Sequence, residues 1–257
     1  MCQINYAENG VGNKVRTVTV EGRDYQVPDH GFWDRFDSWE PETRKIFRQI
    51  VKGGDTVLDI GAWIGPTVLF ALSAGADRVI AVEPNPASRA MLERLINLNP
   101  GMGKKVTVVP MAVCNGPGYL HLGQPQGDSD SSLFGIGGRD IVVDCLSIID
   151  LIERQGLKEI SLIKIDVEGS EILLAEDFHQ LGKRPGQNIH LSIHRPFWPR
   201  DSHPEALAHA LAGYEIWDDR GQALTQADLH SRLVTTRSRP DWGTRHGNFF
   251  ELRLRAR

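Results

Sequence analysis

The stretch from Asp55 to Pro66, which reads Asp-Thr-Val-Leu-Asp-Ile-Gly-Ala-Trp-Ile-Gly-Pro, constrains the fold of this chain more than any other. Its largely apolar run from Val57 to Ile60 predicts a parallel strand that is covered on both faces. Gly61 and Gly65 then allow the backbone to turn tightly and to approach a ligand closely. Pro66 suits the first position of a helix. The stretch therefore predicts a buried strand, a glycine turn and a helix.

A second strand, from Arg78 to Val82, ends at an acidic residue, Glu83. A carboxylate at the end of this strand accepts hydrogen bonds from both hydroxyls of a ribose. Together with the glycine turn, Glu83 predicts a cofactor that contains a nucleoside. The alternative is an ordinary turn between a strand and a helix, with no ligand.

The spacing of the glycines separates two classes of cofactor. The dinucleotide fingerprint is G-x-G-x-x-G, whereas Asp59, Gly61 and Gly65 form D-x-G-x-x-x-G, with Trp63 where a further glycine would stand. A tryptophan side chain there would obstruct the close approach of a pyrophosphate. S-adenosylmethionine has no phosphate, but it has a ribose for Glu83 and a carboxylate and an ammonium group for the turn. The spacing therefore favours S-adenosylmethionine.

Composition excludes several other classes of protein. The chain has 257 residues, of which 40% are hydrophobic, so we expect one sizeable core. A net charge of -4 gives no general attraction to nucleic acid or to an anionic membrane. The three cysteines, Cys2, Cys114 and Cys145, lack C-x-x-C spacing, and their odd number argues against a disulfide framework. With no signal peptide and no apolar run long enough to span a bilayer, we predict a cytoplasmic protein without membrane association.

The N-terminal residues 1–38 are expected to form an appendage to a main domain of residues 39–257. Val15 to Val20 and Tyr25 to Val27 flank a polar turn and predict a hairpin. The aromatic residues that follow either cover a bound ligand or, more simply, pack the terminal segment onto the core. These residues are Phe32, Trp33, Phe36 and Trp39.

Strands and helices alternate through three rounds as far as Pro110, which predicts a doubly wound parallel sheet with right-handed crossovers. The segment from Ala112 to Asp140 interrupts this alternation and is rich in Gly, Ser, Pro and Asp. It either lines a site or forms a disordered excursion. Ser147 is expected to cap the next helix. Tyr214 to Trp217 and Phe249 to Leu254 predict a closing pair of strands.

A later strand begins at Ile160 and is expected to end at Asp166. Because side chains alternate along a strand, Lys164 and Asp166 share one face of an otherwise apolar element. Gly169 then turns the chain, and Ser170 is expected to cap a helix.

Three polar side chains are expected at the carboxyl edge of the sheet, where ligands bind in proteins of this class. Asp166 and Glu168 follow the strand just described, and His194 ends the strand from Asn188 to His194. His194 lies level with Asp166 if the two strands are neighbours. His190 lies deeper, and we expect it to be structural.

Four stretches of the sequence resemble the FkbM family of S-adenosylmethionine-dependent methyltransferases, in order and spacing, over roughly residues 38 to 200. They are Trp39-Glu-Pro-Glu-Thr43, Asp59-Ile-Gly-Ala-Trp-Ile-Gly65, Ala81-Val-Glu-Pro-Asn85 and Lys164-Ile-Asp-Val-Glu-Gly-Ser-Glu171. The fourth is the most specific, because it is not general among Rossmann-like enzymes. Members of the family usually carry a small polar residue at the position of Trp63.

The resemblance implies a Rossmann-like, doubly wound sheet of seven strands that is mostly parallel, with an antiparallel last strand. It also implies O-methylation, typically of a hydroxyl on a natural product or a sugar. The positions that match the family motifs are expected to bind the cofactor. They are Glu40, Asp59, Gly61, Ala62, Trp63, Gly65, Glu83, Pro84 and Asn85.

Methyl transfer to a hydroxyl requires that the acceptor is oriented and that its proton is removed. Asp166, Glu168 and His194 are of the right type to act as catalytic residues, with Glu168 as base, metal ligand or hydrogen-bond partner. The same three residues are candidate ligands for a divalent metal that would activate the hydroxyl.

Two other functions stay open. The chain could be a cofactor-binding protein without small-molecule catalysis, or a nicotinamide-dependent dehydrogenase, against which Trp63 and the missing glycine argue. Methylation of nucleic acid is weaker still, because no Asn/Asp-Pro-Pro-aromatic stretch follows the strand that ends at Asp166. We therefore expect a small-molecule acceptor and no nucleic-acid partner; the sequence predicts no oligomeric state.

Overall fold

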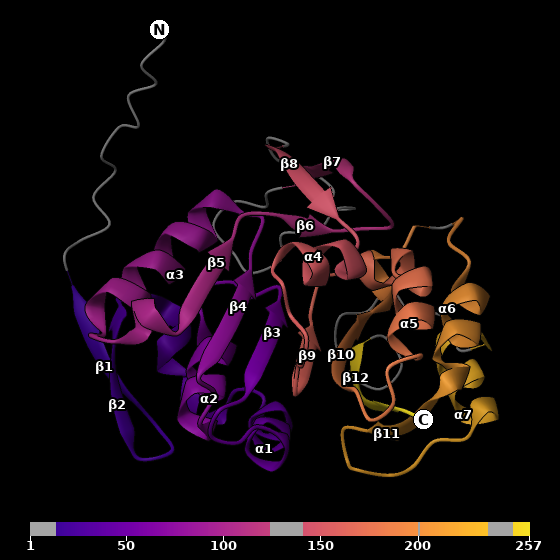
Figure 1. Cartoon of the computed structure of the whole chain (residues 1–257), viewed down its shortest axis with the longest axis horizontal. Coiled ribbons are helices and arrows are strands. Elements are labelled where there is room, and N and C mark those ends of the chain that lie inside the picture. Colours follow the sequence, from indigo (N-terminus) through magenta and orange to yellow (C-terminus); the bar gives the residue numbers. More distant parts are fainter. Residues whose placement is uncertain (1–13, 124–140, 200, 236–248) are drawn as a thin grey trace, which may run out of the picture.

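A computed structural model describes residues 14–123, 141–199, 201–235 and 249–257. Its centre is a sheet of seven strands in the order β11-β12-β10-β9-β3-β4-β5 (Figure 1). Parallel pairing joins β10, β9, β3, β4 and β5, whereas β12 runs antiparallel to both of its neighbours. The strands are β3 (Thr56–Ile60), β4 (Arg78–Val82), β5 (Val106–Val109), β9 (Leu162–Ile165), β10 (Asn188–His194), β11 (Tyr214–Asp218) and β12 (Phe249–Ala256). The predicted seven-stranded, mostly parallel sheet is confirmed.

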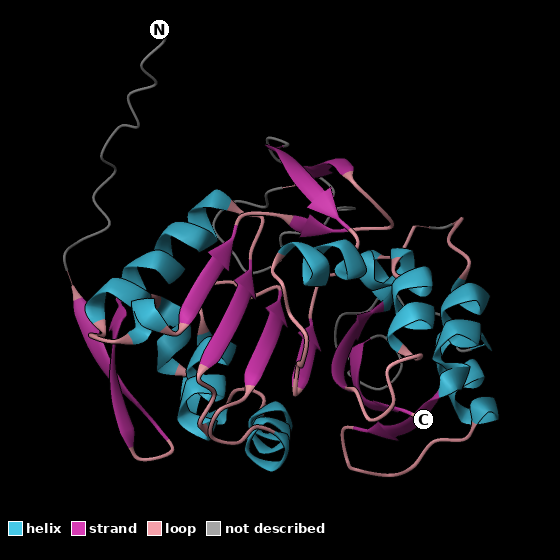
Figure 2. Ribbon diagram, viewed as in Figure 1, coloured by secondary structure: helices cyan, strands magenta, loops and turns pink. Residues whose placement is uncertain are grey.

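Helices cover both faces of this sheet (Figure 2). Val57 and Leu58, adjacent in β3, belong to two separate hydrophobic cores, because successive side chains of a strand point to opposite faces. The core that contains Val57 is completed by α1 (Pro41–Ile50), α2 (Pro66–Ala74) and α3 (Pro86–Leu98). The core that contains Leu58 is completed by α4 (Ile148–Arg154), α5 (Ala175–Leu181), α6 (Pro204–Ala210) and α7 (Gln226–His230).

The strand, glycine turn and helix predicted around residue 60 are all present. Gly65 is the N-cap of α2 in the left-handed conformation, with φ of 100°, and Pro66 is the first helical residue. Gly75, at φ of 117°, ends the helix. Ser147 caps α4, because its hydroxyl accepts a hydrogen bond from the Asp150 N–H at 3.0 Å.

Part of the N-terminal appendage packs directly on the core. β1 (Val15–Val20) and β2 (Arg23–Pro28) form an antiparallel hairpin where one was predicted, and β2 lies against α3. The turns η1 (Gly31–Asp34) and η2 (Phe36–Ser38) then bury Phe32, Trp33 and Phe36. Phe36 stacks on Phe70 of α2, with ring centroids 5.6 Å apart. The expected packing of these aromatic residues onto the core is confirmed.

A small sheet of three strands sits beside the large one. It consists of β6 (Ala112–Val113), β8 (Ile141–Leu146) and β7 (Gly118–Leu122), in that order. A short turn, η3 (Met102–Lys104), precedes β5 in the chain. The small sheet brings Cys114 and Cys145 into contact as free, buried thiols. Residues 124–140 of the interrupting segment, and Cys2, lie outside the described residues.

The predicted cap at Ser170 is wrong. Gly169, at φ of 100°, precedes a short turn, η4 (Ser170–Leu173), and α5 begins only at Ala175. Gly169, not Ser170, stands at the N-cap position of this turn, and its N–H donates to the carboxylate of Glu171 at 2.8 Å. Gly169 also packs so closely on Phe197 that a Cβ would lie 2.6 Å from the Phe197 Cβ.

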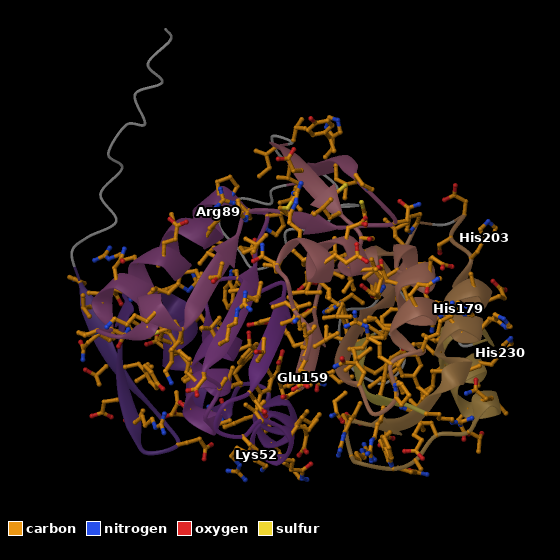
Figure 3. All side chains as sticks on the ribbon, viewed as in Figure 1. Lys52, Arg89, Glu159, His179, His203 and His230 are labelled. Atoms are coloured by element: carbon orange, nitrogen blue, oxygen red, sulfur yellow. The ribbon has the colours of Figure 1, made fainter. Side chains whose placement is uncertain are left out.

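The outer surface carries many polar and charged side chains, among them Lys52, Glu159 and His203, which Figure 3 labels. The remaining short elements, η5 (Arg195–Phe197), η6 (Leu211–Gly213) and η7 (Ser231–Thr235), join the later strands and helices. Among the described residues, every helix falls short of the length and apolar character needed to cross a bilayer.

Substituting Gly61 tests how closely the turns after β3 and β9 pack. Gly61 has φ of 80°, and a Cβ there would lie 1.7 Å from the carbonyl oxygen of Asp166. We expect Gly61→Ala to lower the free energy of unfolding by about 3 kcal/mol or more, measured in urea. Gly53→Ala is the control, since its Cβ would enter open space, and it should change stability by less than about 1 kcal/mol. Equal effects of the two substitutions would contradict the close packing.

Candidate active site

A cavity of about 170 Å³ lies at the carboxyl ends of the parallel strands. Its walls come from the N-terminal segment around Phe32 and Trp39, from the turns after β3, β4, β5 and β9, and from the end of β10. This is the edge at which sheets of this kind bind ligands.

The structure divides the predicted cofactor residues into two groups. Five line the cavity: Glu40, Gly61, Trp63, Glu83 and Pro84. The other four, Asp59, Ala62, Gly65 and Asn85, stand behind its wall. All three predicted catalytic residues, Asp166, Glu168 and His194, line the same cavity.

The residues behind the wall shape the turns. Asp59 is fully buried and accepts a hydrogen bond from the Thr67 hydroxyl at 2.6 Å, which joins β3 to α2. Asn85 caps α3 through the Ala87 N–H at 2.9 Å. A Cβ on Gly65 would lie 2.8 Å from Cδ1 of Leu92, so this glycine permits close packing of α2 on α3.

Glu83 is buried at the floor of the cavity, and both of its carboxylate oxygens accept backbone hydrogen bonds. Oε2 accepts from the Trp63 N–H and Oε1 from the Asn85 N–H, each at 2.8 Å. Burial nevertheless raises the pKa of Glu83 to about 7. A carboxylate has about four acceptor positions, so two hydrogen bonds leave capacity for a ligand.

Trp63 lines the cavity and packs on the N-terminal segment. Its backbone is left-handed, with φ of 48°, and its ring packs edge-on against Phe32 and His30, with centroids 4.7 and 5.7 Å away. The residue therefore links the glycine turn to the N-terminal segment while its N–H holds Glu83.

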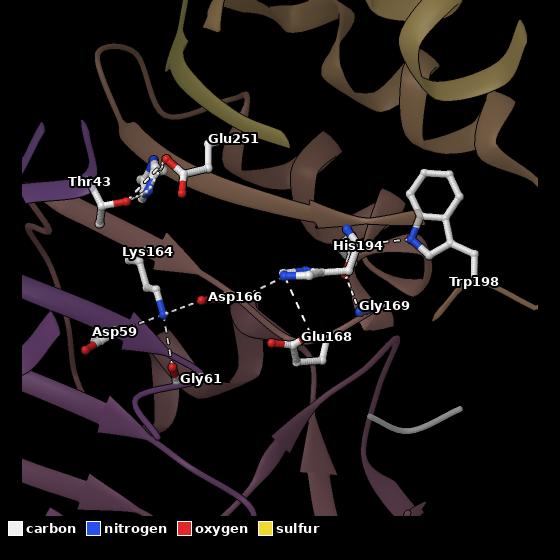
Figure 4. A network of polar contacts seen from close by, with 12 residues as sticks. Thr43, Asp59, Gly61, Lys164, Asp166, Glu168, Gly169, His194, Trp198 and Glu251 are labelled. Atoms are coloured by element: carbon white, nitrogen blue, oxygen red, sulfur yellow. Dashed lines mark hydrogen bonds and ion pairs between the residues drawn. The ribbon is translucent and has the colours of Figure 1, made fainter. Parts of the chain in front are cut away.

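A buried lysine joins the turns after β3 and β9 (Figure 4). The side chain of Lys164 is 2% exposed, and its Nζ donates to the Gly61 carbonyl at 3.0 Å. Nζ also lies 3.2 Å from Asp166 Oδ2 and 3.7 Å from Asp59 Oδ1. Burial opposes the charge, but Asp166 and Asp59 outweigh it and raise the pKa of Lys164. The ammonium group therefore stays charged.

Asp166, Glu168 and His194 form a cluster that we call the acid–histidine cluster. Nε2 of His194 lies 3.5 Å from Asp166 Oδ1 and 3.5 Å from Glu168 Oε2 (Figure 4). Burial lowers the pKa of His194, but Glu168 and Asp166 outweigh burial, and the pKa is raised. Burial likewise opposes ionisation of Asp166, whereas Lys164 and His194 hold its pKa below the ordinary value. The expected proximity of the three residues is observed, because β9 and β10 pair in parallel.

Glu171 holds this cluster in place, a role that the sequence reading missed. It is fully buried, and its Oε1 accepts from the His194 N–H at 2.5 Å and from Trp198 Nε1 at 2.9 Å. Its Oε2 accepts from the Gly169 N–H. The sequence signal for this role is the position of Glu171, which follows the turn at Gly169 and precedes the apolar residues Ile172 to Leu174. Glu168 itself has φ of 47°, an uncommon conformation that is concentrated at functional sites.

His190 lies deeper than His194, as expected. It is fully buried, its Nε2 lies 3.0 Å from the Thr43 hydroxyl, and burial together with Lys164 lowers its pKa to about 4. The imidazole is therefore neutral at physiological pH.

Several residues around the cavity were not predicted to bind the cofactor. Met111, Ala112 and Val113 follow β5 and form an apolar wall, and the rule that ligands bind at the carboxyl ends of strands could have indicated them. Phe32 and Trp39 both pack on the core and line the cavity, so the two interpretations of the aromatic cluster are compatible.

A second groove adjoins the cavity and shares Trp39, Glu40 and His194 with it. It runs along β10 and β12, where Phe249 and Glu251 form part of its wall. Burial and the charges of neighbouring carboxylates raise the pKa of Glu40 to about 8. The Oε2 atom of Glu40 is buried and has no hydrogen-bond partner in the described part of the chain.

Comparison with solved structures finds methyltransferases at low sequence identity. The FkbM methyltransferase from Methylobacillus flagellatus KT has a TM-score of 0.48 and 14% identity, over 82% of this chain and 50% of that one. TYW2 from M. jannaschii, solved in complex with AdoMet, has a TM-score of 0.45 and 15% identity, over 94% of this chain and 84% of that one. This chain thus spans about half the length of the Methylobacillus protein.

None of the curated proteins matches the chain. Residues 59–177 match the model described as the Methyltransferase FkbM domain. This match covers less than half of the chain and contains three of the four stretches singled out in the sequence, so this part of the chain is similar to the FkbM methyltransferase domain.

Proposed function

We propose that this chain transfers a methyl group from S-adenosylmethionine to a hydroxyl on a small natural product or a sugar. The observation that carries the proposal is that one cavity is lined both by Glu83 and by the acid–histidine cluster. Glu83 offers acceptors for ribose hydroxyls, and the cluster offers groups that handle a proton. The seven-stranded sheet would serve as a Rossmann-like platform for both.

The residues present fit the chemical groups of S-adenosylmethionine. Glu83 would accept hydrogen bonds from the ribose, and the apolar wall of Met111 to Val113 would cover the adenine. The unpartnered Oε2 of Glu40 suits the ammonium group of the methionine part. The bound cofactor supplies the methyl group as a sulfonium carbon, open to displacement by the acceptor oxygen.

The chain's own residues would orient the acceptor and take up its proton. Glu168 would receive the proton, and the position of this residue in the cavity wall supports that role. A close pair of ion-paired groups titrates as a unit, so His194 and Asp166 would share in the charge change. The groove that shares Trp39, Glu40 and His194 with the cavity gives the acceptor a route to this point.

We infer that the acceptor is a small molecule and that neither nucleic acid nor a membrane is a partner. The net charge of -4 supports this inference. The free thiols of Cys114 and Cys145 favour a reducing cytoplasm as the place of action, with a task in natural product biosynthesis.

The affinity for S-adenosylhomocysteine should depend on pH through Glu83. Its pKa of about 7 means that the carboxylate is mostly protonated at pH 6 and mostly ionised at pH 8. The ionised form accepts stronger hydrogen bonds and has more acceptor positions for the ribose hydroxyls than the protonated form. We expect binding, measured by calorimetry, to be roughly tenfold weaker at pH 6 than at pH 8. Glu83→Gln should bind weakly at both pH values; if it kept the affinity and the pH dependence of the unaltered chain, the ribose role would be refuted.

Removing the Asp166 carboxylate should separate catalysis from cofactor binding. We expect Asp166→Asn to abolish transfer of labelled methyl groups from S-adenosylmethionine to a small-molecule extract, while S-adenosylhomocysteine still binds. Asp77→Asn, in an exposed ion pair with Lys105, is the control and should transfer normally. Normal transfer by Asp166→Asn would contradict the assignment. Cofactor binding without any labelled product, in the unaltered chain, would favour a cofactor-binding protein without catalysis.

A further inference from the structure

Three ligand-type atoms of the acid–histidine cluster converge on one point of the cavity wall. Oδ1 or Oδ2 of Asp166, a carboxylate oxygen of Glu168 and a ring nitrogen of His194 all lie within 4.8 Å of one another. Two of these residues come from the turn after β9 and one from the end of β10, so the sheet fixes their separation.

We propose that Asp166, Glu168 and His194 bind one divalent metal ion of the Mg²⁺ and Mn²⁺ class. The further step, that this ion binds the oxygen of the methyl acceptor and lowers its pKa, rests on the proposed function. The metal site itself does not, because it follows from the donor set alone.

The donor set selects this class of ion. Two carboxylate oxygens favour hard cations such as Mg²⁺ and Mn²⁺, and the imidazole shifts the preference toward Mn²⁺. The absence of thiolates argues against a structural zinc site of the usual kind. Three protein ligands leave coordination positions for water and for an acceptor hydroxyl, and the cavity lies on that side.

The surroundings prepare the three ligands. Oδ1 of Asp166 is buried and has no hydrogen-bond partner among the described residues, whereas Oδ2 is held by Lys164 at 3.2 Å. Glu171 fixes the backbone of His194 at 2.5 Å. Lys164 therefore holds one carboxylate oxygen of Asp166, and the other faces His194 Nε2 at 3.5 Å without a hydrogen bond. Supporting residues orient metal ligands in this way.

Without a metal, the same contacts would be an ion-pair cluster between a charged imidazole and two carboxylates. Such a cluster would not bind added Mn²⁺ saturably. A titration therefore distinguishes the two.

The test uses the full chain, stripped with a chelator, dialysed and titrated with Mn²⁺ alone, with free Mn²⁺ followed by electron paramagnetic resonance. We expect one bound ion per chain. His194→Asn and Glu168→Gln should each weaken binding on the order of tenfold or more. Glu168 lies on a turn and is partly exposed, so its variant should fold even if His194→Asn does not.

His179→Asn and Glu176→Gln are matched controls. Both residues are exposed on α5, away from the cavity, and both variants should bind Mn²⁺ as the unaltered chain does. No saturable binding, or binding that the cluster variants leave unchanged, would overturn the metal site. Calorimetry with S-adenosylhomocysteine runs in parallel. Binding of that ligand without Mn²⁺ binding would refute the metal site alone, and the reverse result would refute the cofactor proposal alone.

Discussion

The candidate site depends on the buried ammonium group of Lys164. It lies between the carboxylates of Asp59 and Asp166 and also donates to the carbonyl oxygen of Gly61. Separated from their partners, these buried charges would each cost several kcal/mol, on the order of the penalty known for broken buried ion pairs. The lysine therefore keeps the turn after β3 and the turn after β9 in contact.

Each of these two turns positions one part of the candidate site. On one side the turn after β3 presents the Trp63 N–H to Glu83, and the Trp63 ring packs on Phe32, so the N-terminal segment is part of the site. On the other side the turn after β9 carries Asp166 and Glu168, and Glu171 ties it to His194. Glu83 and the acid–histidine cluster are thereby held at one edge of the sheet.

Local signals in the sequence predicted much of this arrangement. The strand and helix pattern around Gly61 depends on neighbours in the chain. Parallel pairing of β9 and β10 brings their carboxyl ends to one edge of the sheet, where the His194 side chain reaches Asp166. The roles that were missed depend on distant residues. Gly65 packs against Leu92, and Gly169 packs against Phe197. A local sequence pattern does not predict such contacts, because the partners lie far apart in the chain. The same holds for Glu171, whose partners include the indole of Trp198.

The most direct test of this account is a crystal structure of the chain with S-adenosylhomocysteine. We expect the ribose hydroxyls to lie within hydrogen-bond distance of the Glu83 carboxylate and the sulfur to face Asp166, Glu168 and His194. A ligand bound outside this cavity, or one whose ribose makes no contact with Glu83, would contradict this expectation.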